Sequence, residues 1–401
     1  MTLKVLTFST LFPNSVRPGH GIFVETRLRE LMKSGRVESR VIAPVPWFPS
    51  THPRWGDYAK FAATPAREQR NGLDVLHPRY LLLPKVGMTS APLTLALGAR
   101  AAVRQLIDEG FDFDVIDAHY YYPDGVAAAL LSRWFGKPLA VTARGSDINL
   151  IGSHSLPRRW MRWAAGVAGA SIGVSQALVE RMRALGVISP RQLMLRNGVD
   201  VERFRADADR AMLRSRLGVE GSPLMLSVGN LVALKGHDLV IEALALLRNQ
   251  GLDARLCIIG AGPLREGLEA LRDRLGLQAQ VRFLGALPQQ ELAAWYAAAD
   301  VLLLASEREG WPNVVLESMA CGTPVVATAV GGIPEIVSPP HTGRVVAERS
   351  AACLAEAVQA LWQTPPSRDA VRSHALDFGW QATTEGQLAL FADLTGAAGH
   401  A

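Results

Sequence analysis

The stretch from Val301 to Ala327, VLLLASEREGWPNVVLESMACGTPVVA, decides the fold. It opens on a short apolar run, Val301–Ala305, and closes on a second one, Pro324–Ala327, and both have the composition of buried strands. A loop and a helix lie between them, and the helix is expected to start near Pro312 because proline is favoured in a first helical turn. This order of strand, helix and strand is typical of a parallel α/β sheet.

Two glutamates frame the expected helix. Glu309 precedes it, and Glu317 lies about one and a half turns into it. A helix start presents N–H groups without intrahelical acceptors and the positive end of the helix dipole, which suits a diphosphate. We therefore interpret the segment as a nucleotide-sugar site, with Glu309 at its mouth and Glu317 accepting hydrogen bonds from vicinal hydroxyls. The alternative is a surface helix with two solvated glutamates.

Strands and helices alternate through the rest of the chain, which predicts an α/β fold with parallel, doubly wound sheets. The expected strands lie near 4–8, 40–44, 114–118, 138–142, 170–174 and 192–195 in the first half, and near 223–229, 255–260, 280–285, 300–305, 324–327 and 343–346 in the second. A turn at Asn197 and a charged run, 205–216, interrupt the alternation and resemble a linker.

The length of the chain, 401 residues, exceeds what one hydrophobic core usually serves. We therefore predict two tandem Rossmann-like domains that face a central cleft. The N-terminal domain covers 1–200, the C-terminal domain covers 201–375, and a helix over 376–401 is expected to cross back to the first domain.

Composition excludes several classes of protein. The net charge of +5 comes without dense basic clusters or a recognition motif, so nucleic-acid binding is not expected. The apolar runs are too short for a spanning helix, and the N-terminus lacks a signal peptide. The three cysteines have neither disulfide nor zinc spacing. These features predict a cytoplasmic protein.

One segment suggests peripheral contact with an anionic membrane at the inner face of the cell membrane. Pro157–Trp163, PRRWMRW, combines three arginines with two tryptophans. The alternative is a surface helix whose tryptophans pack on the core and whose arginines are solvated.

The loops after the strands carry candidate binding groups, because ligands of open α/β sheets bind beyond the carboxyl ends of the strands. In the second half, Lys235 precedes a helix and is expected to supply a charge for a leaving diphosphate. The alternative is that Lys235 is a surface lysine without a role in binding. Gly262 belongs to the turn Gly260-Ala-Gly-Pro263, which permits close approach of a ligand to the backbone.

The first half has its own candidates. Gly19 and Gly21 lie in a turn before a helix, where backbone N–H groups can approach a phosphate. His119 ends a strand and is predicted to bind an acceptor or phosphate oxygen. Arg144 and Asp147 follow the next strand, and Arg144 suits acidic substrate oxygens. Glycines required only by the turn, and a structural histidine, remain alternatives.

Taken in order, these motifs resemble those of the family 4 glycosyltransferases of the retaining GT-B type, over essentially the whole chain. The resemblance rests on Glu309 to Glu317 with Gly322-Thr-Pro-Val-Val-Ala327, Gly229 to Gly236, Gly260 to Pro263, Asn197 to Asp200, His119, and the loop with Gly145 and Asp147. Two positions depart from the family pattern. Asn230 stands where the family often has arginine, and Arg144-Gly145 stands where it often has His-Gly.

The resemblance implies that the N-terminal domain takes the acceptor side and the C-terminal domain binds the nucleotide sugar. It also implies a role for each matching residue. Glu317 would bind the ribose hydroxyls, Glu309 the donor-sugar hydroxyls, and Lys235 the diphosphate. Asn230 and Gly262 would lie on the donor side, and His119 near the sugar and acceptor. The remaining assignments are backbone contacts of Asn313, Val314, Val315, Gly19 and Gly21 with the donor, and Arg144, Asp147 and Arg196 on the acceptor or phosphate side.

The implied activity is transfer of a hexosyl group, with retention and without a metal or other cofactor, from a nucleotide-diphosphate sugar to a glycan or lipid-linked acceptor in cell-envelope or exopolysaccharide synthesis. Two alternatives stay open, a GT-B-fold nucleotide-sugar epimerase and a non-catalytic nucleotide-sugar binding protein. The sequence leaves the base, sugar, acceptor, linkage and oligomeric state unassigned.

Overall fold

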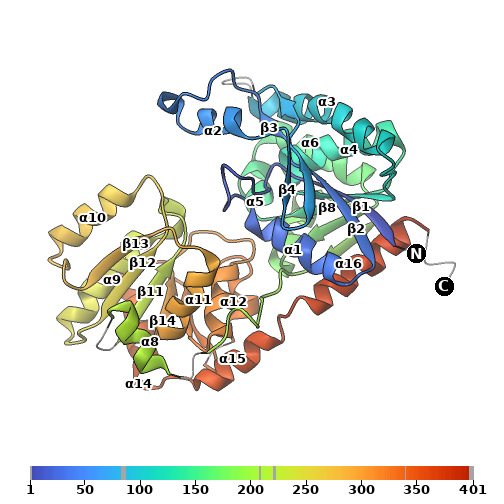
Figure 1. Cartoon of the computed structure of the whole chain (residues 1–401). Helices are drawn as coiled ribbons and strands as arrows, with labels where there is room; N and C mark the ends of the chain where they lie inside the picture. Colours follow the sequence, from blue (N-terminus) through green and yellow to red (C-terminus); the bar gives the residue numbers. More distant parts are fainter. Residues whose placement is uncertain (1, 83–86, 207–208, 220–222, 339, 397–401) are drawn as a thin grey trace. The chain divides into compact units, whose positions relative to one another are not determined.

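The structure, a computed structural model, describes residues 2–82, 87–206, 209–219, 223–338 and 340–396. The chain divides into two compact units (Figure 1). Unit 1 comprises residues 1–197 with 381–401, and unit 2 comprises residues 198–380.

Unit 1 is built on an eight-stranded sheet with the order β10-β9-β8-β7-β1-β2-β5-β4. Every pair of neighbours is parallel except β4 and β5. The strands are β1 (Leu3–Phe8), β2 (Val37–Ile42), β4 (Arg67–Arg70), β5 (Leu73–Leu76), β7 (Val115–His119), β8 (Leu139–Ala143), β9 (Ala170–Gly173) and β10 (Arg191–Met194). Strands β7, β8 and β9 are buried throughout, as expected for a parallel sheet covered on both faces.

Helices connect these strands. They are α1 (Ile22–Lys33), α2 (Asp57–Ala63), α3 (Gly87–Asp108), α4 (Val126–Phe135), α5 (Ser146–Asn149), α6 (Ser155–Val167) and α7 (Gln176–Ala184), with short turns η1 (Pro53–Trp55), η2 (Tyr121–Gly125) and η3 (Ile151–Ser153). Two further short strands, β3 (Val45–Pro46) and β6 (Arg79–Tyr80), pair with each other.

The hairpin of β4 and β5 was not among the expected elements. Its turn is Asn71-Gly72, and both residues have positive φ, 48° and 81°. A two-residue turn of this sequence and conformation matches the twist of an antiparallel pair. The Asn-Gly pair was therefore the signal in the sequence for this hairpin.

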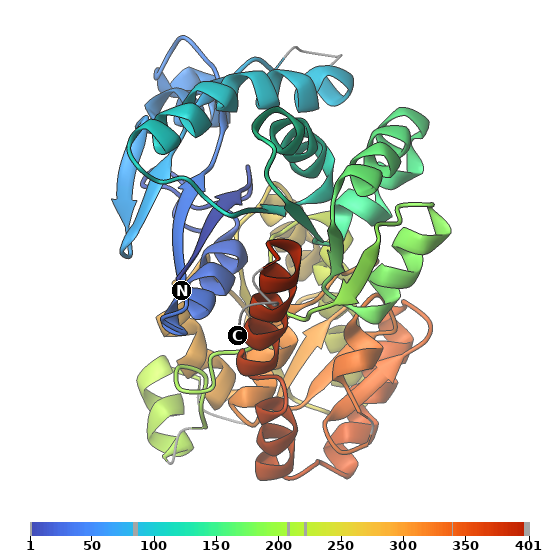
Figure 2. The ribbon, with the colours of Figure 1, turned by 90° about the vertical axis from the view of Figure 1, so that its right-hand side faces the viewer.

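The helix expected over 376–401 corresponds to α16 (Gln381–Leu394), which belongs to unit 1. A separate helix, α15 (Arg368–Leu376), precedes it in unit 2. α16 lies beside α1 (Figure 2), and Leu388 and Phe391 join Val5 and Val115 in one hydrophobic cluster. Residues 397–401, the end of the expected segment, lie outside the described residues.

Unit 2 is built on a six-stranded parallel sheet with the order β13-β12-β11-β14-β15-β16. The strands are β11 (Leu224–Val228), β12 (Arg255–Ile259), β13 (Val281–Gly285), β14 (Val301–Leu304), β15 (Val325–Thr328) and β16 (Gly343–Val346). The helices are α8 (Arg210–Leu217), η4 (Ala233–Lys235), α9 (His237–Asn249), α10 (Arg265–Arg274), α11 (Gln289–Ala298), α12 (Asn313–Ala320), α13 (Ile333–Ile336) and α14 (Ala351–Gln363), besides α15.

The predicted linker over 205–216 is wrong in one part, because α8 occupies most of it. Asp209 caps this helix by accepting a hydrogen bond from the Met212 N–H at 2.9 Å. Arg210 and Arg214 form ion pairs with the buried end of Asp300, which anchors α8 to unit 2. The charges in this run therefore bind the helix to the protein.

Candidate active site

In unit 2, Lys235 and Glu309 form an ion pair. The distance from Lys235 Nζ to Glu309 Oε1 is 2.5 Å, and the exposed fractions of the two side chains are 21% and 11%. Ser306 Oγ donates to the same carboxylate oxygen at 2.7 Å. Lys235 follows β11 and Glu309 follows β14, neighbouring strands of the parallel sheet, so both groups lie at the carboxyl edge that the sequence predicted.

Glycines bring the loops around this pair close together. Gly236 has a φ of 66°, and a Cβ there would lie 2.3 Å from the Ala305 carbonyl oxygen. A Cβ on Gly331 would lie 2.0 Å from the Glu309 carbonyl oxygen. Since these contacts are with backbone, neither position has room for a side chain. The glycines therefore set the backbone positions of both charged residues.

The predicted turn at Gly260–Pro263 packs against the loop after β11. A Cβ on Gly262 would lie 2.5 Å from the Leu231 carbonyl oxygen, and the Leu231 N–H donates to the Ala261 carbonyl at 3.0 Å. Asn230, in the same loop, is exposed. Gly262 thus has a packing role in addition to the donor contact expected of it.

The helix α12 begins at Asn313, one residue after Pro312, which is its N-cap. Asn313 and Val314 are partly exposed, whereas Val315 is buried and its N–H donates to the Pro312 carbonyl at 3.0 Å. In this structure the Val315 N–H, one of the groups expected to contact the donor, is therefore already engaged.

Glu317 lies inside α12 with an exposed fraction of 8%. The hydroxyl of Tyr296, on α11, donates to Glu317 Oε2 at 3.1 Å. Burial raises the pKa of Glu317 to about 7, and the Tyr296 hydrogen bond and Arg203 oppose this shift. The reading of Glu317 as a solvated surface residue is therefore wrong. Tyr296 was not identified from the sequence, because an aromatic residue on an apolar helix has no distinguishing pattern.

In unit 1, His119 is buried and both of its ring nitrogens have partners. Arg144 Nη2 lies 2.6 Å from His119 Nδ1, and Asp117 Oδ2 lies 3.2 Å from His119 Nε2. Arginine can only donate, so Nδ1 accepts and the Nε2–H donates to Asp117. Burial lowers the pKa of His119 to about 4, which makes the neutral ring the dominant form. Contact of His119 with a substrate oxygen would require one of these partners to move.

Arg144 is held from several sides. Its Nη1 donates to Asn197 Oδ1 at 2.9 Å, and its guanidinium lies 5.1 Å from the centroid of the Phe23 ring. Burial lowers the pKa of Arg144 to about 9, and the neighbouring Arg27 adds to the shift. Its Nε is buried without a hydrogen-bond partner among the described residues. The bonds to Asn197 and His119 use two of the five N–H donors of this guanidinium, so Nη1 and Nη2 each keep a second N–H besides the buried Nε.

Asp147 shapes the loop that carries Arg144. Its carboxylate accepts from the N–H groups of Gly145 at 2.8 Å, Tyr121 at 2.6 Å and Arg144 at 3.1 Å. Asp147 is fully buried, so it folds the loop and has no free face for an acceptor. Asp147 lies in α5, shortly after β8, and its burial does not support the direct contact with an acceptor that was expected of it.

Arg27 and Gln387 complete the buried charged cluster, and the sequence did not indicate either. Arg27 Nε donates to Gln387 Oε1 at 2.9 Å, and Gln387 Nε2 donates to Asp117 Oδ2 at 3.3 Å. Arg27 is 1% exposed, and burial lowers its pKa to about 10. Arg196, which was also expected at this site, directly precedes Asn197, the residue that accepts from Arg144. The Arg196 carbonyl accepts a hydrogen bond from Thr383 Oγ1 at 2.6 Å.

The two glycines in the turn before α1 differ in the space around them. Gly19 is exposed with no atom within 4 Å of a Cβ placed on it, whereas a Cβ on Gly21 would lie 2.2 Å from the Leu11 carbonyl oxygen. Gly21 has a φ of 68° and is the N-cap of α1. Gly21 is therefore required by the turn itself, and Gly19 is the residue that leaves the backbone accessible.

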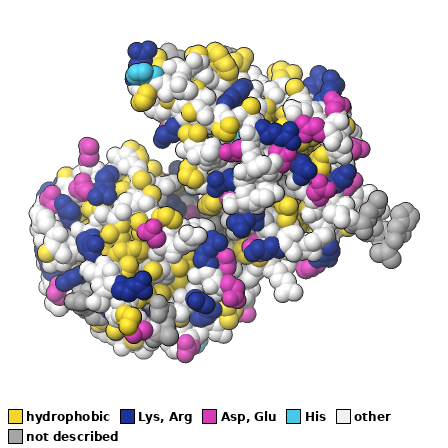
Figure 3. Space-filling view, viewed as in Figure 1, with side chains coloured by type: hydrophobic (Ala, Val, Ile, Leu, Met, Phe, Trp, Pro, Cys, Tyr) yellow, Lys and Arg dark blue, Asp and Glu magenta, His cyan; other side chains and the backbone are white. Residues whose placement is uncertain are grey.

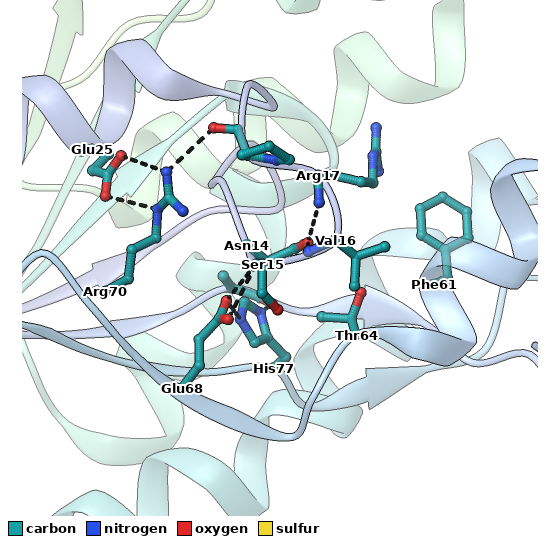
Figure 4. A network of polar contacts seen from close by, with 12 residues as sticks. Asn14, Ser15, Val16, Arg17, Glu25, Phe61, Thr64, Glu68, Arg70 and His77 are labelled. Carbon is teal, nitrogen blue, oxygen red and sulfur yellow. Dashed lines mark hydrogen bonds and ion pairs between the residues drawn. The ribbon is translucent and has the colours of Figure 1, made fainter. Parts of the chain in front are cut away.

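The β4–β5 hairpin holds this turn in place (Figure 4). Arg70 pairs with Glu25 at 2.8 Å and donates to the Pro18 carbonyl at 3.3 Å. Glu68 accepts from the Ser15 N–H at 3.1 Å and contacts the buried His77 at 2.9 Å. The loop before α1 is thus bonded to the hairpin at Ser15 and at Pro18.

Residues 19–203 match the Glycosyltransferase Family 4 domain, and residues 209–377 match the domain named Glycosyl transferases group 1. TuaC of Bacillus subtilis strain 168, a glycosyltransferase named for teichuronic acid biosynthesis, is 30% identical over 361 residues, which cover 89% of this chain and 88% of TuaC. The chain belongs to glycosyltransferase family 4.

The glycosyltransferase is also similar to a mycobacterial mannosyltransferase and to a solved structure. A GDP-mannose-dependent alpha-(1-6)-phosphatidylinositol monomannoside mannosyltransferase of Mycolicibacterium smegmatis is 31% identical over 83% of this chain and 86% of its own length. The solved structure of HepE from Anabaena with UDP and glucose has a TM-score of 0.71 at 21% identity, and covers 98% of this chain and all of HepE. The enzyme has the GT-B fold of two Rossmann-like units.

No helix in the described part of the glycosyltransferase is long and apolar enough to span a membrane. No group of three or more His, Cys, Asp or Glu side chains there is arranged to hold a metal ion.

Proposed function

We propose that the glycosyltransferase moves a hexosyl group, with retention, from a nucleotide-diphosphate sugar to a glycan or lipid-linked acceptor of the cell envelope. The observation that carries this proposal is the Lys235–Glu309 pair, placed at the carboxyl edge of the unit 2 sheet and followed in sequence by the start of α12. The similarity to TuaC, and the UDP and glucose in HepE, support it.

Lys235 is assigned to the diphosphate. An ammonium has three N–H donors, and the contact with Glu309 uses one of them. The others are available to phosphate oxygens, whose negative charge increases as the bond to the sugar breaks. A preorganised cation at this point stabilises the leaving group more in the transition state than in the bound donor.

Glu309 is assigned to the donor sugar. Ser306 and Lys235 both donate to Oε1, which fixes the carboxylate and leaves Oε2 to accept from sugar hydroxyls. Glu317 is assigned to the ribose, where its ionised carboxylate would accept from two vicinal hydroxyls. The start of α12 at Asn313 and Val314 adds N–H groups and the helix dipole near the diphosphate.

Unit 1 is assigned to the acceptor. Arg144, whose side chain is partly exposed, is the group proposed to touch an acceptor or phosphate oxygen, through N–H donors of Nη1 or Nη2 that the bonds to Asn197 and His119 do not use. His119, with both nitrogens engaged, is proposed to position Arg144. Asp147 and Gly21 maintain the loops, and Gly19 supplies accessible backbone. No separate carboxylate nucleophile is invoked, because retention is proposed to proceed by displacement on one face of the sugar, assisted by the leaving phosphate.

A thermal-shift screen with UDP-, GDP-, ADP- and TDP-sugars tests donor binding, because a ligand that binds only the folded protein raises its apparent stability. NMR of the product then reports whether the anomeric configuration is retained. Activity after treatment with EDTA should be unchanged if no metal takes part. Conversion of a nucleotide sugar without any acceptor would instead indicate an epimerase, and binding without turnover a non-catalytic protein.

A further inference from the structure

Large hydrophobic side chains are exposed along one edge of unit 1. The exposed fractions are 53% for Trp47, 43% for Trp55, 50% for Tyr58, 52% for Leu93 and 53% for Leu97. Figure 3 shows hydrophobic and basic side chains gathered at the upper edge, over the α2 and α3 region of Figure 1. We call these five residues, with Arg54, Arg100 and Arg104, the α2–α3 surface. Patches of this kind on a soluble fold mark sites of interaction.

The aromatic side chains of the surface pack against one another. The Phe48 ring lies 5.5 Å from the Trp55 ring and 5.2 Å from the Tyr58 ring, measured between centroids. Arg79, from β6, donates to the Phe61 carbonyl at 2.9 Å and also to the carbonyl of Thr64. These bonds fasten α2 to the strand pair β3–β6, so the aromatic rings are presented on a fixed platform.

The outer face of α3 continues the surface. Leu93, Leu97, Arg100 and Arg104 are exposed and follow the spacing of one helical face, whereas Leu95, Ala99 and Leu106 are buried beneath. The helix is held against β6 at Gly98, where a Cβ would lie 2.4 Å from the Arg79 carbonyl oxygen. The outer face of α3 therefore has an apolar half, with Leu93 and Leu97, and a basic half, with Arg100 and Arg104.

The charge on this surface is net positive, because Asp57, the one acidic residue of α2, is paired with Lys60 at 2.9 Å. Gly87–Ile107 contains two arginines and no acidic residue. Arg54 lies 4.9 Å from the Trp55 ring centroid, and Arg100 lies 5.4 Å from that of Trp134, which is itself 39% exposed. Among the described residues, no carboxylate forms an ion pair with Arg54, Arg100 or Arg104. Their positive charges are thus available to an anionic partner.

We propose that the α2–α3 surface binds the headgroup region of an anionic lipid bilayer. Tryptophan and tyrosine favour the membrane–water interface, leucines on an amphipathic face insert below it, and arginines attract anionic headgroups. A hollow of about 240 Å³ between Trp47, Arg79, Tyr80 and Leu81 provides an apolar recess in the same surface. This inference rests on the proposed function in one respect only: membrane contact would bring the enzyme to a lipid-linked acceptor.

The segment Pro157–Trp163 is less suited to this role. It lies in α6, where Met161 is buried and the Arg162 Nε is engaged by the Leu185 carbonyl at 2.7 Å. Trp160 is 37% exposed, and its ring packs edge-on against Trp163. The basic tryptophan segment therefore contributes less exposed apolar area than the α2–α3 surface.

Flotation of the full chain with vesicles tests the proposal. The wild-type protein should float with phosphatidylcholine vesicles that contain phosphatidylglycerol, and less with phosphatidylcholine alone. The double variant Leu93→Ser with Leu97→Ser should reduce partition by about tenfold or more, since two leucine side chains no longer leave water. Arg100→Glu with Arg104→Glu should abolish the preference for anionic vesicles.

A matched control is Met212→Ser with Leu246→Ser in unit 2, where the exposed fractions are 60% and 37%. The control should float like wild type. Absence of flotation by the wild type, or equal loss in the control, would overturn the proposal. Thermal shift by UDP-sugars should be the same in all variants, so loss of vesicle binding is distinguishable from failure of the proposed donor site.

Discussion

Gln387, on the C-terminal helix α16, donates a hydrogen bond to Asp117, on the central strand β7, although the two residues are 270 positions apart in the chain. Asp117 accepts from His119, and His119 accepts from Arg144. The last helix of the chain is therefore connected by buried hydrogen bonds to the residue assigned to the acceptor or phosphate.

Replacing Gln387 tests this connection. In Gln387→Ala the bond to Asp117 is lost, and so is the acceptor for Arg27, which leaves buried polar groups unsatisfied. We expect kcat to fall by about tenfold while the KM for the donor changes little, because the donor residues are in unit 2. Steady-state kinetics separates these effects.

The matched control is Glu385→Ala on the same helix, which loses only an ion pair with Arg36 between side chains that are more than half exposed. A positioning role also predicts that Gln387→Glu, which keeps the acceptor but loses the N–H donor, recovers only part of the activity. Equal effects of Glu385→Ala and Gln387→Ala would argue for a general loss of helix stability.

Lys235→Ala should lower the chemical rate by about 100-fold or more, by comparison with the removal of one preorganised group that stabilises developing charge. The ion pair with Glu309 is lost as well, but both side chains retain some exposure, so the fold should persist. Single-turnover kinetics measures the effect. Arg308→Ala, a neighbouring exposed arginine, is the control, and near-wild-type turnover of the Lys235 variant would remove that residue from the mechanism.

Glu317 should make nucleotide binding depend on pH. Burial raises its pKa to about 7, so protonation below this value removes the charge that would accept hydrogen bonds from ribose. We expect affinity for the nucleoside diphosphate to fall as pH decreases below about 7, by up to about tenfold per pH unit for one proton. Calorimetry between pH 5.5 and 8 measures this, and Glu317→Gln should show a weak, flat profile.

The same pKa shift has an opposite effect on folding. Because the folded pKa is above the unfolded one, the stabilisation from protonated Glu317 is fully present below the unfolded pKa and is lost as pH rises to about 7. The free energy of unfolding of the wild type, relative to that of Glu317→Gln, should therefore decrease over this range in the absence of nucleotide. Denaturant titrations at several pH values would show it. A constant difference would contradict the raised pKa.

Two glycines provide a test of the packing around the site. Gly260→Ala places a Cβ 1.8 Å from the Gly229 carbonyl oxygen at a φ of 153°, and should lower the melting temperature strongly or prevent folding. Gly267→Ala in α10 meets no atom within 4 Å and should add about 0.5–1 kcal/mol of stability. Thermal unfolding compares the two.

Much of the fold could be predicted from the sequence, because short apolar runs bounded by turn residues alternate with longer helical stretches along the chain. Each expected strand has a counterpart in one of the two sheets. The β4–β5 hairpin could not be found by this criterion, because β4 reads Arg-Glu-Gln-Arg and is not buried. Its signal was the turn, Asn71-Gly72, and not the strand.

The site divides in the same way. Lys235, Glu309 and Arg144 were predictable, because residues after parallel strands gather at one edge of a sheet. The partners of these residues were not, since contacts such as Lys235 with Glu309 depend on which strands are neighbours. Arg27 and Gln387 were missed because charged and amide residues on helices are ordinarily exposed. Only the packing of α1 and α16 shows that these two are buried.

The β4–β5 hairpin, part of which is drawn in Figure 4, can influence substrate selectivity without touching substrate. Arg70 and Glu68 hold the backbone of the loop before α1, yet neither is assigned to a substrate. Changes of length or charge in the hairpin would therefore shift the accessible backbone at Gly19 while every residue assigned to substrate stays the same. Selectivity in this unit can therefore be altered from outside the binding site, by substitutions in a peripheral hairpin.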